Sequence, residues 1–186
     1  ATVASSEFDV AQSVAEGVTM LYDAQDPAAA ILDPNAAYER SLGTLTGTAA
    51  DSDSSINTVE ITISTGSAAP YTDQYWTGSA WVGTVQWLTA LAADGSFNTT
   101  SEGWYYTGST PTWINNRIYK IQVRAKDSAL NNGTIVSSTF TFDDTPASAG
   151  VVVPSNLAAF RSLTLVTGTM SDTPNPAPTT VQIALR

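Results

Sequence analysis

Residues 40–51 read Arg40-Ser41-Leu42-Gly43-Thr44-Leu45-Thr46-Gly47-Thr48-Ala49-Ala50-Asp51, and residues 161–172 repeat the pattern as Arg161-Ser162-Leu163-Thr164-Leu165-Val166-Thr167-Gly168-Thr169-Met170-Ser171-Asp172. Gly47 and Gly168 lie 121 residues apart, and Asp51 and Asp172 have the same spacing. Further matches flank these stretches, since residues 31–35 resemble 152–155 and residues 59–63 resemble 181–185. Self-similarity at a fixed spacing is typical of tandem structural units, so the chain is predicted to hold parts of more than one unit.

A second match fixes where the units begin and end. Residues 1–8 resemble residues 133–140 at a spacing of 132. Together the two matches divide the chain into three parts. Residues 1–25 are predicted to be the last strand of a preceding repeat plus a linker, 26–143 a complete repeat, and 144–186 the opening strands of a following repeat.

Alternation of apolar and polar residues predicts strands within the complete repeat. Val59, Ile61 and Ile63 alternate with polar neighbours, and so does the run from Tyr119 to Ala125. Turn-forming clusters at 50–55, 126–133 and 143–148 separate such runs, and a short helical turn is expected around 86–93 or 11–16. The chain holds 27 Thr and 20 Ser, a composition that favours strands over helices. We predict an all-β, antiparallel β-sandwich.

Several segments, in order along the chain, resemble the tandem bacterial Ig-like repeats of large surface proteins and adhesins. They are Leu45–Asp51, Ile56–Ile61, Tyr75–Trp81, Tyr119–Asp127 and Phe140–Pro146. The resemblance implies an Ig-like (fibronectin-like) sandwich, an extracellular or cell-surface location, an adhesin, stalk or filament role, and calcium at the joints between repeats. The loop Lys126–Asn132 departs from the tighter Asp-x-x-Gly-Asn turn of that family.

Composition and charge disfavour several other functions. The chain has no His and no Cys, which removes the usual nucleophilic triads and zinc ligands. A net charge of −10 disfavours nucleic-acid binding, and the short apolar runs predict no membrane insertion. Carboxylate pairs such as Glu60 with Glu102 arise by chance in an acidic chain, so we predict that the protein is not an enzyme.

The aspartates suggest a calcium site at one pole of the sandwich. In an Ig-like topology the segment before the first strand, the turn after the second and the turn before the last meet at one end. The predicted ligands there are Asp26, Asp51, Asp53 and Asp127, and the corresponding set for the next joint is Asp143, Asp144 and Asp172. Oxygen ligands from separate segments suit Ca²⁺, although aspartates also cap turns without binding any ion.

All five tryptophans fall within an aromatic cluster at 71–113. The residues considered as a ligand or contact surface are Trp76, Trp81, Trp104, Tyr105 and Trp113. Exposed rings could stack on surface glycans, whereas covered rings would stabilise hairpins on the sandwich. The leading hypothesis is therefore a structural module whose partners are neighbouring repeats or subunits of the same protein. The alternatives are a carbohydrate-binding module and a filament subunit joined by strand addition. Asn98 and Asn132 also fit the pattern for N-glycosylation.

Overall fold

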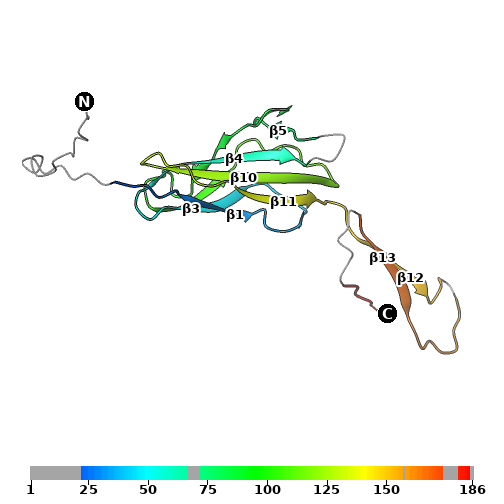
Figure 1. Cartoon of the computed structure of the whole chain (residues 1–186). Helices are drawn as coiled ribbons and strands as arrows, with labels where there is room; N and C mark the ends of the chain where they lie inside the picture. Colours follow the sequence, from blue (N-terminus) through cyan, green and yellow to red (C-terminus); the bar gives the residue numbers. More distant parts are fainter. Residues whose placement is uncertain (1–21, 67–71, 157, 174–179, 185–186) are drawn as a thin grey trace, which may run out of the picture.

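The computed structural model describes residues 22–66, 72–156, 158–173 and 180–184, and every regular element in them is a β-strand (Figure 1). The strands are β1 (Ala28–Asp33), β2 (Tyr38–Glu39), β3 (Leu45–Ala50), β4 (Ile56–Thr65), β5 (Tyr75–Trp76), β6 (Trp81–Val82), β7 (Leu88–Thr89), β8 (Leu91–Ala92), β9 (Ser101–Tyr106), β10 (Arg117–Asp127), β11 (Val136–Phe142), β12 (Ser148–Val153) and β13 (Thr167–Ser171). The all-β prediction is confirmed. No helix among the described residues has the length and apolarity to cross a membrane.

Two sheets enclose one apolar core. The first has the order β1-β3-β9-β8, and the second has the order β2-β11-β10-β4-β5-β6, with β7 also paired to β4. Alternation places one face of β10 inside, where Tyr119, Ile121, Val123 and Ala125 are buried as the sequence predicts. On β4 the polar Thr62 and Ser64 are buried as well. Ser64 satisfies its hydroxyl by donating to the Lys120 carbonyl at 3.2 Å.

The chain changes sheets at places where the sequence offers no clear period. Strands β1 and β3 pair with each other in the first sheet, whereas β2, which lies between them in the sequence, joins the second sheet in parallel with β11. The helical turn expected around 86–93 is wrong, because β7 pairs with β4 in one sheet and β8 pairs with β9 in the other. The Ala90 N–H donates to the Val59 carbonyl at 2.9 Å at the crossing. The other expected turn, at 11–16, lies outside the described residues.

The last two strands form a separate hairpin beyond the end of β11 (Figure 1). Their pairing runs from Ser148 opposite Ser171 to Val153 opposite Thr167, with a register shift between Val151 and Val153. The pairing of β1 with β3 runs from Ala28 opposite Ala50 to Asp33 opposite Thr46, with its shift between Ile31 and Asp33. The two hairpins therefore have the same register, displaced by 120 residues in the first strand and 121 in the second.

Candidate metal centre

Asp51 is the first residue after β3 and organises the turn to β4. Its Oδ1 accepts hydrogen bonds from the backbone N–H groups of Asp53 and Ser54, both at 2.8 Å. The residue is 8% exposed, and its Oδ2 is buried without a hydrogen-bond partner. The turn thus fixes one oxygen of the carboxylate and leaves the other available to a ligand.

Asp127 is the last residue of β10 and is fully buried. Its Oδ1 accepts from the backbone N–H of Asn131, and its Oδ2 accepts from the Asn131 side-chain amide, both at 2.8 Å. The same amide lies 3.4 Å from the carbonyl oxygen of Asp23. Asn131 therefore ties the loop after β10 to the segment that enters β1.

Asp23 supplies the third carboxylate from that entering segment. Its Oδ1 accepts from the Gln25 N–H at 2.9 Å, whereas its Oδ2 is buried and has no hydrogen-bond partner. One carboxylate oxygen from each of Asp23, Asp51 and Asp127 lies within 4.8 Å of the other two. The buried hydroxyl of Ser54 likewise has no hydrogen-bond partner among the residues that the structure describes.

These three carboxylates could hold a metal ion. The hydrogen-bond partners recorded for the three carboxylates are neutral groups, so none of them offsets the negative charge. A buried polar atom without a partner costs about 1–3 kcal/mol, and more when it is charged. Carboxylate oxygens are ligands of hard cations, and each of the three residues offers one oxygen to such an ion.

The structure brings together two of the four residues predicted for this pole, Asp51 and Asp127. Asp26 and Asp53 are exposed, and Asp53 accepts a hydrogen bond from the neighbouring Ser52 hydroxyl. Sequence reasoning missed Asp23 because it took the aspartate nearest the strand. The sequence did contain a signal, because Asp143 lies 120 residues after Asp23, which is the spacing of the internal repeat. In the structure the two residues also act alike, since Asp143 accepts a hydrogen bond from the N–H of Thr145, two residues on.

The residues predicted for the next joint do not form a cluster of three in the described part of the chain. Asp143 is nearly buried, and its N–H donates to the Glu39 carbonyl at 2.9 Å. Asp144 is exposed and donates its N–H to the Asn115 side chain, while Asp172 caps the N–H of Thr173. Asp143 and Asp172 lie 120 and 121 residues after Asp23 and Asp51 in the sequence.

Of the five candidate aromatic residues, Trp104 lies in the core, Trp76, Trp81 and Trp113 pack against it, and Tyr105 lies on the opposite face of β9. Trp104 is 1% exposed and donates its indole N–H to the Thr48 carbonyl at 3.1 Å. Trp113 meets the Tyr119 ring edge-on at 4.8 Å between centroids, and the Trp81 ring stacks on Tyr119 at 6.1 Å. Trp76 and Tyr105 are half-buried, and the Trp76 ring lies 5.3 Å from that of Trp81.

Glu102 stabilises the loop at residues 98–100, which contacts the turn that contains Asp51. Its Oε1 accepts from the N–H groups of Asn98 and Thr99 and from the Thr99 hydroxyl, at 3.0, 2.7 and 2.7 Å. The same loop offers the Thr100 carbonyl to the Asp51 N–H at 2.8 Å. The backbone hydrogen bond from Asn98 and the Thr99 hydroxyl lower the pKa of Glu102 below its ordinary value of 4.5.

A lowered pKa means that ionised Glu102 stabilises the fold at neutral pH. That contribution is complete above the ordinary pKa of 4.5 and is lost as the pH falls through the lowered value. We expect Glu102→Gln to lower the free energy of unfolding by about 1 kcal/mol at pH 7. Urea unfolding from pH 7 to pH 3 should show the gap to the parent closing in acid. A gap that stays constant would contradict this role.

No protein-family model, curated protein or solved structure matches this chain.

Proposed function

We propose that this chain is a non-enzymatic structural module of a repetitive extracellular or cell-surface protein, built from tandem Ig-like units. The strand order supports an Ig-like unit. The order β1-β3-β9-β8 is the order expected for the A-B-E-D sheet of an Ig domain, and β11-β10-β4 is the order expected for G-F-C. The Tyr119 hydroxyl near the start of β10 accepts the Ile114 N–H at 2.9 Å, an upstream contact like the tyrosine corner of such domains.

One observation carries the tandem arrangement. β12 and β13 repeat the register and the irregularity of β1 and β3. They also repeat a close approach at glycine, because a Cβ on Gly47 would lie 2.0 Å from the Ala30 carbonyl oxygen and one on Gly168 would lie 2.3 Å from that of Gly150. The shared register, bulge and glycine contact together favour tandem units over chance similarity between Thr-rich strands.

The proposed role of calcium is to stiffen the joint before the sandwich. Asp23 belongs to the segment entering β1, whereas Asp51 and Asp127 belong to the body of the sandwich. An ion held by all three would fix that segment against the sandwich. Weak sites with a Kd of about 0.1–1 mM serve extracellular modules, because calcium outside cells reaches that range. This argument favours an extracellular location.

The two alternatives have unequal support. A carbohydrate-binding module needs a row of accessible rings, yet Trp104 is buried and Trp76, Trp81 and Trp113 pack against the core. A filament subunit joined by strand addition gains support from the apolar residues that the β12–β13 hairpin leaves exposed, Val151, Val152 and Met170. Strand addition also needs a neighbouring copy, so it is compatible with the structural role.

Pulling on the full chain between its ends tests the proposal. The sandwich should unfold in a single event, because β1 and β11 enclose one core and resist extension together. Extending the 115 residues from Ala28 to Phe142 should release about 35–40 nm of chain. Single-molecule force spectroscopy measures that length directly. A gradual extension without a discrete event would contradict a role in spanning distance under tension.

A further inference from the structure

In the sandwich the ring of Trp104 packs directly against Gly47. Gly47 lies on β3 directly opposite Trp104 of β9. A Cβ at Gly47 would lie 2.3 Å from Cζ2 of the Trp104 indole, so only glycine leaves room for the ring. The indole N–H donates to the carbonyl of Thr48, the residue after the glycine. An aromatic ring laid across a glycine on the neighbouring strand stabilises a sheet at a position that glycine alone would weaken.

Gly168 on β13 corresponds to Gly47, but no aromatic ring packs against it in the described part of the chain. Gly168 takes the place of Gly47 in the matching register, and Thr169 takes the place of Thr48. The nearest atoms to a Cβ at Gly168 belong to Gly150 and Val151 of β12, and no aromatic side chain is among them. In the described chain β13 pairs only with β12, whereas β3 has β1 on one edge and β9 on the other.

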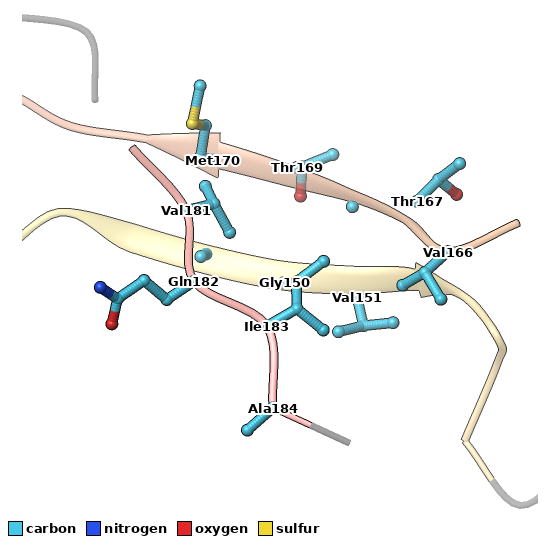
Figure 2. Close-up of a pocket in the computed structure, with 12 residues that line it drawn as sticks. Gly150, Val151, Val166, Thr167, Thr169, Met170, Val181, Gln182, Ile183 and Ala184 are labelled. Carbon is cyan, nitrogen blue, oxygen red and sulfur yellow. The ribbon is translucent and has the colours of Figure 1, made fainter. Parts of the chain in front are cut away.

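An apolar hollow lies where the missing ring would go. Figure 2 shows residues 181–184 crossing one face of the hairpin, with Val181 and Ile183 over Met170 and Gly150. The hollow between them has a volume of about 520 Å³. Val181 and Ile183 are 50% and 61% exposed, while their counterparts in the complete sandwich, Val59 and Ile61, are fully buried. On this face Val181 and Ile183 therefore lack the cover that Val59 and Ile61 have.

We propose that the free edge of β13 binds an antiparallel strand that carries a tryptophan opposite Gly168. The ring occupies the hollow, and its indole N–H donates to the Thr169 carbonyl. The occupant is a segment of the β9 type from another unit of the same repetitive protein, so the inference rests on the tandem units proposed above. The chain's own β9 does not serve, because it is already paired with β3 and β8.

A peptide in trans tests this binding on the full chain. The probe is a synthetic peptide of residues 98–109, which contains all of β9, titrated into the isotope-labelled protein. Binding should shift the backbone amide signals of Thr167–Ser171 and give contacts between the indole and Gly168. The same peptide with Trp104→Ala should bind at least about tenfold more weakly, because the ring supplies the buried contact.

Two variants of the protein locate the peptide. Gly168→Ala puts a methyl group in the ring's place, but the group also crowds Gly150 and disturbs the hairpin. Ile183→Lys avoids this, since it places a charge in the hollow from outside the hairpin, and it should weaken binding by a similar factor. Val152→Lys is the matched control, because Val152 is exposed and does not line the hollow, and it should leave binding unchanged.

Three results would overturn the proposal. They are equal binding of the two peptides, signal shifts away from β13, and no shift at millimolar peptide. Each of these would leave the unfolding event of the sandwich and its response to calcium unaffected. A failure of strand binding is therefore distinguishable from a failure of the structural role.

Discussion

Trp104→Ala should lower the free energy of unfolding by about 4 kcal/mol, because the largest buried side chain is removed from the centre of the core. The loss has two parts. Removing the indole leaves a cavity over Gly47, and the Thr48 carbonyl loses the indole N–H from which it accepts a hydrogen bond. Urea unfolding followed by far-UV circular dichroism measures the change without depending on tryptophan fluorescence.

Trp87→Ala is the matched control for this substitution. Trp87 is half-buried, and its ring lies 4.0 Å from the guanidinium carbon of Arg124. A cation–π contact at such a site contributes about 0.5–1 kcal/mol, so the cost should be well below that of Trp104→Ala. Similar losses at the two positions would show that the tryptophans act as one surface cluster and that the core assignment of Trp104 is wrong.

The strands with strict alternation could be predicted from the sequence. Tyr119 to Ala125 show a period of two, and burial follows it residue by residue because β10 has one face on the core. The sheet change at Ala90 could not be predicted in this way. Strands β7 and β8 have two residues each, too few to show a period, and their pairing depends on partners far away in sequence.

The candidate site could be predicted in part for a related reason. Asp51 directly follows β3 and Asp127 is the last residue of β10, so the topology alone brings them to one pole. Asp23 lies five residues before β1, in a segment without alternation, and is held by the Asn131 amide from a loop more than a hundred residues away. The tryptophans show the same limit, because composition gives a cluster while burial depends on which ring faces the core.

The electrostatics of this pole predict opposite effects of one substitution with and without calcium. Ionised carboxylates whose oxygens lie within 4.8 Å of one another repel, and the neutral groups that they contact do not offset that repulsion. Asp51→Asn removes one charge while keeping an oxygen that accepts the N–H groups of Asp53 and Ser54. In chelator, therefore, Asp51→Asn should be at least as stable as the parent.

Calcium should reverse that order. An ion that binds only the folded chain stabilises it by about 2.7 kcal/mol at a hundredfold excess over Kd, which raises the parent's midpoint of thermal unfolding by roughly 5–10 °C. Asp51→Asn should lose most of this shift, because Asp51 supplies an open buried oxygen. Asp53→Asn, in the same turn but exposed, should keep it. Differential scanning calorimetry in calcium and in chelator measures all three proteins. An unmoved midpoint in the parent, or an equal shift in Asp51→Asn, would mean that these carboxylates only organise turns.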